Sequence, residues 1–439
     1  EGPIISSDML LGENYDARRD MPGWDRPGFD DSGWKNSEVL EPTDAVLTAQ
    51  PSQPVRIVDS LKPVAVTEPK PGVFVFDMGQ NFAGWARLTV KGPAGTMVTL
   101  RFAEMVNPDG TIYTENLRNA RSTDTYTLRG DGVEIWEPSF TFHGFRYVEV
   151  TGFPGTPTAK NITGRVITST TPPAGSFTCS NPMVNRLWSN IRWSQLANFI
   201  SIPTDCPQRD ERQGWMGDAQ IFFRTAAYNA DVSAFFTKWM RDVNDEQSPE
   251  GAFRDTSPFV GHGLGGDGAP AWGDAGVIVP WAFHTVYGDT LMLRSCWPFM
   301  EKWMSYLERL NPDFVRKNPK QSYGDWLSIN ADTPKDLLAT AYWADDARMM
   351  SRIAGILGID DARARYDALF GSIRDAFRRE FVTGGAHVKG ETQTGYLLAL
   401  AMDLLPESSR ADAAALLVKN IERNGWRLST GFLGVRYLC

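Results

Sequence analysis

The stretch PKDLLATAYWADDARMMSRIAGILGIDDARARYDALFGSIRDAFRREF, residues 334–381, predicts two helices joined by a tight connection. Gly358 is the residue type that ends a helix in a left-handed conformation, and Asp360 favours the start of the next helix. Similar helical patterns recur through the second half of the chain, in pairs separated by Gly-rich or Asp-rich connections. Repeated helical hairpins of this size predict a helical toroid rather than a four-helix bundle.

Nine helices are predicted in all. They cover residues 183–200, 219–228, 232–243, 276–287, 291–307, 334–356, 361–381, 394–404 and 410–424. Asn181 is a suitable cap for the first of them. A complete (α/α)6 barrel has six hairpins and therefore needs twelve helices. We therefore expect the barrel to be incomplete at its C-terminal side.

The first half of the chain has a different sequence pattern. Short runs such as VFVFDMG, ARLTVKG, TMVTLRFAEM, DTYTLRG and FRYVEVTG alternate apolar and polar residues and end near Gly, Pro or Asp. Runs of this kind predict an antiparallel β-sandwich. The strand-like pattern gives way to the helical one after the linker-like Thr170–Pro173. We expect residues 1–52 to be the tail of a β-sandwich domain, 53–170 a β-sandwich domain, and 171–439 the helical barrel.

Composition excludes several classes of protein. The chain has 44 basic and 53 acidic residues among 439, a net charge of −9, so it offers no basic stripe for nucleic acid. Its uncharged apolar runs fall short of the roughly 18 residues of a membrane-spanning helix, so we expect a soluble protein without a membrane partner. The 15 tryptophans suggest either sugar-stacking surfaces or large cores.

The cysteines and histidines suggest no metal site. The four cysteines lie far apart and form no C-x-x-C pair, and no EF-hand-type loop occurs, so no metal is assigned. The compartment stays open, with the periplasm or secretion favoured over the cytoplasm. His143, in a predicted strand, is interpreted as structural. His262, in a Gly-rich loop, is interpreted as either a plain loop residue or one that borders a site.

The densest polar cluster is PTDCPQRDERQGWMGD, residues 203–218. Glycosidic bonds are cut by one carboxylic acid that protonates the leaving oxygen and one carboxylate that activates water or attacks carbon. Glu211, bracketed by aspartates, is the candidate acid, because neighbouring negative charge and partial burial keep such a group protonated. If a helix begins near Glu211, then Glu211 and Asp218 share one face of it. The alternative is a solvated helix start, where acidic residues favour the helix dipole.

The run DCPQRDERQGWMGDAQ, residues 205–220, resembles the signature of bacterial α-L-rhamnosidases, glycoside hydrolase family 78. Further similar strings follow in the family's order: GENYDARRDMPGWDRPGFDDSGW, DMGQNFAGWARLTVKG, FTFHGFRYVEVTGFPG, GAPAWGDAGVIVPW, YGDWL and STGFLGVRYL. The resemblance implies β-sandwich domains followed by a catalytic (α/α)6 barrel. It also implies hydrolysis of terminal α-L-rhamnosyl residues with inversion and without an organic cofactor.

The resemblance also implies roles for individual residues. Glu211 corresponds to the general acid, while Asp205, Arg209 and Asp218 correspond to residues that bind rhamnose hydroxyls. The expected aromatic wall around the sugar, whose methyl group prefers apolar contact, consists of Trp215, Trp272 and Trp326. For each tryptophan the alternative is plain core packing.

One departure from the family's pattern concerns the general base. In the family it is a glutamate downstream of the string that resembles STGFLGVRYL, and none of the matched motifs supplies it. We therefore expect the base to lie in a segment absent from this chain, and the chain alone to be inactive. Expected partners are a rhamnose-containing glycoside or oligosaccharide and either the remainder of the polypeptide or a second copy. The alternatives are another (α/α)6 glycosidase, acting on a rhamnose-like or uronic sugar, and a carbohydrate-binding protein without catalysis.

Overall fold

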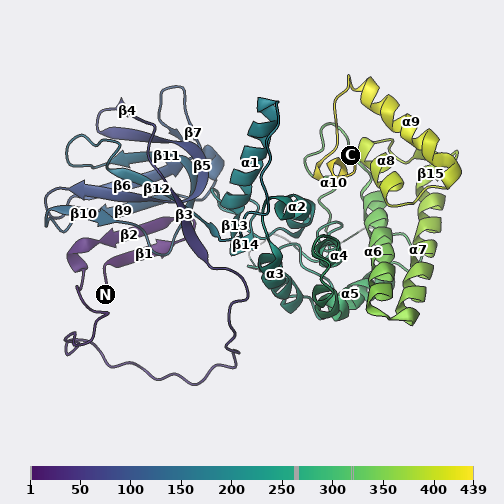
Figure 1. The fold of residues 1–439 in the computed structure, drawn as a ribbon, viewed down its shortest axis with the longest axis horizontal. Helices are drawn as coiled ribbons and strands as arrows, with labels where there is room; N and C mark the ends of the chain where they lie inside the picture. The colour runs from purple at the N-terminus through teal and green to yellow at the C-terminus, as the bar shows by residue number, and fades with distance from the viewer. Residues whose placement is uncertain (1, 262–265, 318, 320, 439) are drawn as a thin grey trace. The chain divides into compact units, whose positions relative to one another are not determined.

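The computed structural model describes residues 2–261, 266–317, 319 and 321–438. The chain divides into two compact units (Figure 1). The first comprises Glu1–Thr170 and Phe177–Arg212, and the second comprises Thr171–Ser176 and Gln213–Cys439. Among the described residues, no helix is both long enough and apolar enough to cross a membrane. His262 lies outside the described residues.

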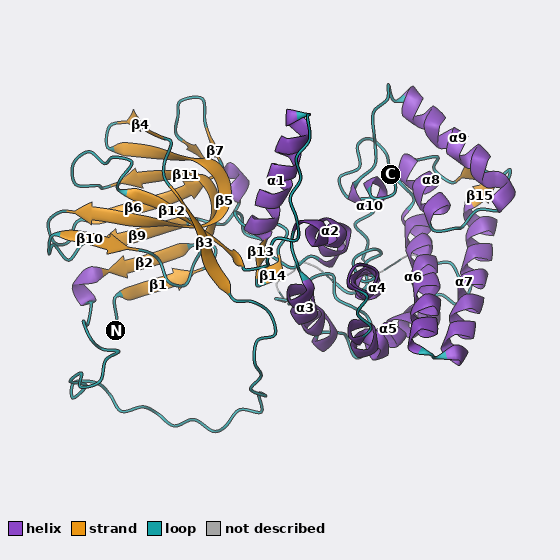
Figure 2. Ribbon diagram, in the orientation of Figure 1, coloured by secondary structure: helices purple, strands orange, loops and turns teal. Residues whose placement is uncertain are grey.

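In the described part of the first unit, ten strands form one sheet (Figure 2). The order is β1 (Ile4–Asp8), β2 (Gly12–Asp16), β9 (Thr123–Thr127), β6 (Met97–Ala103), β11 (His143–Thr151), β5 (Val73–Lys91), β12 (Ile162–Ser169) and β3 (Val55–Leu61), with β4 (Ala65–Lys70) and β10 (Val133–Trp136) also paired to β5. The pairs are antiparallel except β2 with β9. The predicted antiparallel strands are thus confirmed.

The sequence runs 73–79 and 86–92, predicted as two strands, belong to the single long strand β5. Its first half pairs with β11 and its second half with β12 and β10, so one strand changes partners along its length. The change occurs at Gly84, where φ is +155° and an added Cβ would stand 1.8 Å from the Arg165 carbonyl oxygen. Only glycine allows this close approach, which lets the sheet curl.

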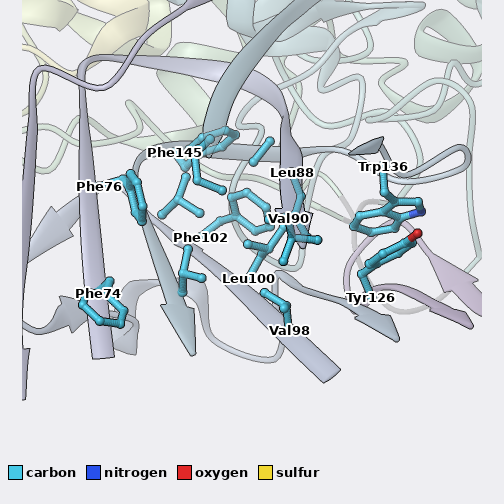
Figure 3. Packing of buried hydrophobic residues seen from close by; sticks show 14 of the residues in the cluster. Phe74, Phe76, Leu88, Val90, Val98, Leu100, Phe102, Tyr126, Trp136 and Phe145 are labelled. Atoms are coloured by element: carbon cyan, nitrogen blue, oxygen red, sulfur yellow. The ribbon is translucent and has the colours of Figure 1, made fainter. Parts of the chain in front are cut away.

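The core of the first unit lies inside this curled sheet (Figure 3). The alternating pattern of strand β6 builds part of this core: Val98, Leu100 and Phe102 are buried and alternate with more exposed residues. At one end of the core, the rings of Tyr126 and Trp136 stack with centroids 5.3 Å apart. Burial of apolar side chains on one face of the sheet stabilises the first unit.

Buried polar residues join β1 and β2 to the rest of the sheet. The Glu13 carboxylate accepts hydrogen bonds from the backbone N–H groups of Ser139 and Phe140, and the Glu13 N–H donates to Asp124. Asp124 also bonds Nε2 of His143, whose ring stacks on Phe102 at 4.2 Å. The interpretation of His143 as a structural histidine is therefore confirmed.

Helix α1 (Pro182–Asn198) belongs to the first unit and packs on β5 and β12. Its N-terminus is capped as predicted, because the Asn181 side chain accepts from the Met183 N–H. The short strands β13 (Phe199–Ile200) and β14 (Ile202–Pro203) follow it. Thr168 donates its hydroxyl to the Phe199 carbonyl and so joins this hairpin to β12.

The described part of the second unit is mainly helical (Figure 2), with one short antiparallel pair, β15 (Val382–Thr383) and β16 (His387–Val388). Its helices are α2 (Met216–Asn229), α3 (Ser233–Asp245), α4 (Ala275–Tyr287), α5 (Leu291–Leu310), α6 (Lys335–Leu357), α7 (Asp360–Phe381), α8 (Gln393–Ala401), α9 (Glu407–Arg423) and α10 (Phe432–Val435). The nine predicted helices are confirmed as α1 to α9, and α10 was not predicted. Helices α6 and α7 form the expected hairpin, and Gly358 between them is left-handed with φ +74°.

Candidate functional site

Residues 204–212 of the polar cluster form no helix or strand. Arg212 explains why, because its φ is +57° and its buried guanidinium donates to the carbonyl groups of Met9 and Phe142. The same guanidinium bonds the carbonyl groups of Arg209 and Gln208. Burial lowers the pKa of Arg212 to about 10. Arg212 therefore ties this segment to the β-sheet unit and prevents it from continuing as a helix.

The Glu211 carboxylate lies between two guanidinium groups. Arg118 Nη2 donates to Glu211 Oε2 at 2.9 Å, and Arg209 Nη2 lies 2.9 Å from the same oxygen. Arg209 also lies 3.6 Å from Oδ2 of Asp205. The Glu211 side chain is 12 % exposed and that of Asp205 is 7 % exposed. The structure thus brings together the predicted acid and two of the predicted sugar-binding residues.

Sequence reasoning missed Arg118. Arg118 follows the 3-10 helix η2 (Glu115–Leu117) with φ +56° and donates from Nε to Asp210 Oδ1 at 2.5 Å. Asn119 adds its backbone N–H and its side-chain amide as donors to Asp210 Oδ2. Burial raises the pKa of Asp210, but the hydrogen bonds from Asn119 and Arg118 outweigh it and leave that pKa below its usual value. Asp210 is therefore a structural partner of Arg118, which in turn holds Glu211.

Asp205, Cys206 and Glu211 each offer one atom that could bind a metal ion, and these three atoms lie within 4.8 Å of one another. This set does not suit a metal ion. Burial raises the pKa of the Cys206 thiol to about 12, whereas metals bind the thiolate. The Glu211 carboxylate already pairs with two guanidinium groups.

The condition under which Glu211 and Asp218 would share a helix face, a helix that begins near Glu211, is not met. Helix α2 begins at Met216, five residues after Glu211, because the buried contacts of Arg212 hold the preceding segment in another conformation. Asp218 is exposed in the first turn of α2, where a carboxylate favours the helix dipole. Glu211 belongs to the first unit and Asp218 to the second.

The three predicted tryptophans surround one tyrosine in the second unit. The ring of Tyr323 lies 4.6 Å from that of Trp272, 5.5 Å from that of Trp215 and 6.5 Å from that of Trp326. Trp326 is 50 % exposed, whereas Trp272 is 3 % exposed and its Nε1 has no partner among the described residues. We call Trp215, Trp272, Tyr323 and Trp326 the aromatic cluster. Tyr323 was missed, although it stands in the quoted string YGDWL.

Two carboxylates near the aromatic cluster in sequence have structural partners. Asp325 accepts from the Thr394 hydroxyl and from the backbone N–H groups of residues 431, 433 and 434. Asp274 accepts from the Ala271 N–H and from Arg316. Both are buried, so the oxygens of each are used to hold neighbouring segments.

Three family models match the chain in order. Residues 1–59 match the α-L-rhamnosidase N-terminal domain, residues 67–168 the bacterial α-L-rhamnosidase concanavalin-like domain, and residues 172–439 the bacterial α-L-rhamnosidase 6 hairpin glycosidase domain. The chain belongs to the bacterial α-L-rhamnosidase family. The resemblance carried by residues 205–220 is thereby confirmed.

Relatives of this rhamnosidase-family chain are similar over all or nearly all of its length. It is 51 % identical to an α-L-rhamnosidase of Streptomyces avermitilis, covering 99 % of this chain and 42 % of the relative. It is 39 % identical to one of Formosa agariphila, covering 100 % of this chain and 48 % of the relative. The chain therefore spans about half the length of the curated relatives it matches.

Solved structures of the family have the same fold. The S. avermitilis α-L-rhamnosidase complexed with L-rhamnose has a TM-score of 0.94 at 51 % identity, and covers 100 % of this chain and 42 % of its own. The α-L-rhamnosidase from Dictyoglumus thermophilum has a TM-score of 0.95 at 37 % identity, and covers 100 % of this chain and 50 % of its own.

Proposed function

We propose that the protein hydrolyses terminal non-reducing α-L-rhamnosyl residues of rhamnosides. Membership of the family supports this reaction, and the related S. avermitilis structure contains L-rhamnose. The observation that carries the proposal is the arrangement of Glu211, which is mostly buried and held by Arg118 and Arg209 beside Asp205. A proton donor held in one orientation is what cleavage of a glycosidic bond requires.

In the proposed mechanism the anomeric configuration is inverted. Glu211 gives its proton to the departing oxygen, while a second carboxylate activates a water on the opposite face, roughly 6.5–9.5 Å away in inverting enzymes. We place that base outside the residues of this chain, in the rest of an (α/α)6 barrel. Support comes from the length of the relatives and from the structural contacts that occupy Asp274 and Asp325.

We further propose that Asp205, Arg209 and Asp218 bind the sugar hydroxyls and that the tryptophans of the aromatic cluster contact the apolar side of the sugar. The buried Nε1–H of Trp272, which has no partner among the described residues, is a suitable donor to a hydroxyl. The proposed reaction uses neither an organic cofactor nor a metal.

The test is release of L-rhamnose from an aryl α-L-rhamnoside by the protein at its natural length. Glu211→Gln keeps the shape of the side chain but removes the transferable proton, so we expect hydrolysis of a natural rhamnoside with a poor leaving group to fall by about 10²- to 10⁴-fold. Glu407→Gln, on an exposed side chain, is the matched control and should keep full activity. Proton NMR of the first product should show the β-anomer.

Two other outcomes would replace the proposal. Binding of L-rhamnose without any release of it would identify a carbohydrate-binding protein. Release of a rhamnose-like or uronic sugar, with aryl rhamnosides left intact, would identify another (α/α)6 glycosidase. Full activity of Glu211→Gln on a natural rhamnoside would remove Glu211 from the mechanism.

A further inference from the structure

We propose that Tyr323, anchored by Asp255, is the residue that positions the tryptophans of the aromatic cluster. The inference rests on the proposed function, because those tryptophans are proposed to contact the sugar. Tyr323 and Asp255 both belong to the second unit, and neither was a candidate from the sequence.

Asp255 is a fully buried carboxylate with three donors. Its Oδ1 accepts from the Ala269 N–H at 2.9 Å, and its Oδ2 accepts from the Gly266 N–H at 2.9 Å and from the Tyr323 hydroxyl at 3.0 Å. Burial of Tyr323, together with the nearby Asp255 charge, raises the pKa of its hydroxyl above the usual value, so the hydroxyl keeps the proton that it donates. A buried carboxylate with several fixed donors is a rigid anchor for that hydroxyl.

The backbone beside Asp255 holds the segment that carries Trp215. The Asp255 carbonyl accepts from the Met216 N–H at 2.9 Å, and Thr256 forms a β-bridge with Trp215. The Ser257 N–H donates to the Gly214 carbonyl at 2.9 Å. Residues 255–257 therefore fix Trp215 through the backbone and Tyr323 through a side chain.

The ring of Tyr323 then contacts each indole in a defined geometry. It meets Trp215 edge to face at 90°, packs on Trp272 at 50°, and meets Trp326 at 81°. Trp272 is confined on another side by Gly217, where an added Cβ would stand 2.5 Å from indole Cε2. Since the hydroxyl end of Tyr323 is held by Asp255, its ring sets the orientation of the indoles around it.

Local secondary structure does not hold Tyr323 in place. The described residues between α5 and α6 form no helix or strand, so the backbone of Tyr323 lacks a regular hydrogen-bonding ladder. The bond to Asp255 therefore restricts a ring that could otherwise turn about its χ angles. Losing this bond should leave the ring in the cluster but let the indoles reorient.

The decisive experiment is Tyr323→Phe in the protein at its natural length, which removes only the hydroxyl. We expect the affinity for L-rhamnose, measured by calorimetry, to weaken about three- to tenfold, which corresponds to the loss of one hydrogen bond. KM for an aryl α-L-rhamnoside should rise by a similar factor. The kcat should change by less than about twofold, because a contact made equally in ground and transition states affects KM alone.

Tyr287→Phe is the matched control. Tyr287 is also partly buried in the second unit, and its hydroxyl accepts from the Val232 N–H at 3.0 Å, away from the aromatic cluster. It should lower the thermal midpoint about as much as Tyr323→Phe but leave L-rhamnose affinity unchanged. If Tyr323→Phe also lowers the midpoint and leaves affinity unchanged, Tyr323 is only structural and the inference is wrong.

A double-mutant cycle with Asp255→Asn tests whether Tyr323 acts through Asp255. We expect Asp255→Asn to weaken L-rhamnose affinity in the wild-type background and to have little further effect in Tyr323→Phe. If the two variants lower the affinity additively, then Tyr323 does not act through its hydrogen bond to Asp255. If the wild-type protein neither binds L-rhamnose nor hydrolyses a rhamnoside, the proposed function fails and the inference fails with it. If the wild-type does both while Tyr323→Phe matches it, only the inference fails.

Discussion

Arg118 donates a hydrogen bond to Glu211 at 2.9 Å, although the two residues are 93 positions apart in the sequence. Arg118 follows a short 3-10 helix between the strands of the β-sheet unit, whereas Glu211 lies in the family signature. The same Arg118 guanidinium also pairs with Asp210. Arg209 pairs with both Glu211 and Asp205. The β-sheet unit therefore takes part in orienting the proposed acid.

Replacing Arg118 by Met should lower kcat/KM for an aryl rhamnoside by about tenfold. The change removes a guanidinium that fixes the carboxylate, and small losses of orientation at a reacting group are costly. The thermal midpoint should change little, because Arg118 is 45 % exposed and such ion pairs contribute at most about 1 kcal/mol. Arg129→Met, which breaks similarly exposed pairs with Asp20 and Asp131, is the control and should leave kinetics unchanged.

The leaving group should decide how much Glu211→Gln costs. A natural rhamnoside with a poor leaving group needs protonation of the departing oxygen, so its hydrolysis should nearly stop. A nitrophenyl rhamnoside leaves as a stable anion and should lose far less activity. Steady-state rates on the two substrates give the comparison. Equal losses on both would mean that Glu211 does not act as the general acid.

The helices were predictable because their signals are local. Asn181 caps α1 through a residue two positions away, and Gly358 ends α6 by its own left-handed backbone. The start of α2 was not predictable from the sequence, because it depends on Arg212. The Arg212 guanidinium binds the Phe142 carbonyl, 70 positions away. No spacing within residues 203–218 encodes that contact.

The same distinction separates the site residues. Asp205, Arg209 and Glu211 stand within seven positions, and their signature identified them together. Arg118 and Asp255 act through contacts made by tertiary folding, 93 and 68 positions along the chain from Glu211 and Tyr323 respectively. A single sequence holds no record of such pairs.

The tryptophans should separate into binding and packing roles according to their exposure. Trp326→Ala removes a half-exposed indole, so it should weaken L-rhamnose binding by about 1–3 kcal/mol with little loss of stability. Trp272→Ala empties a buried position beside Gly217 and should also cost about 3–5 kcal/mol of unfolding free energy. Calorimetry and denaturant unfolding on the same preparations measure both quantities. Unchanged affinity in Trp326→Ala would assign that residue to the surface alone.

A buried pair of carboxyl groups should make stability fall as pH rises. Asp346 is fully buried and accepts from Trp303 Nε1 at 2.9 Å. Burial raises the pKa of Asp346 well above its usual value, and the Asp274 carboxylate beside it raises that pKa further. The folded protein thus keeps a proton that the unfolded chain releases above about pH 4. Between that pH and the raised native pKa, the free energy of unfolding should fall by up to about 1.4 kcal/mol per pH unit.

Asp346→Asn should remove this dependence, because the amide presents a permanent N–H to Asp274 without having to take up a proton. Urea unfolding at several pH values between 5 and 8 gives the free energy of unfolding as a function of pH. In the variant, the fall of this free energy with pH should correspond to one proton fewer than in the wild-type protein. Asp375→Asn, at a 70 % exposed side chain, is the matched control and should keep the wild-type slope. A wild-type slope in Asp346→Asn would mean that Asp346 does not hold the proton, since its removal would then leave the difference in bound protons between the folded and unfolded chains unchanged.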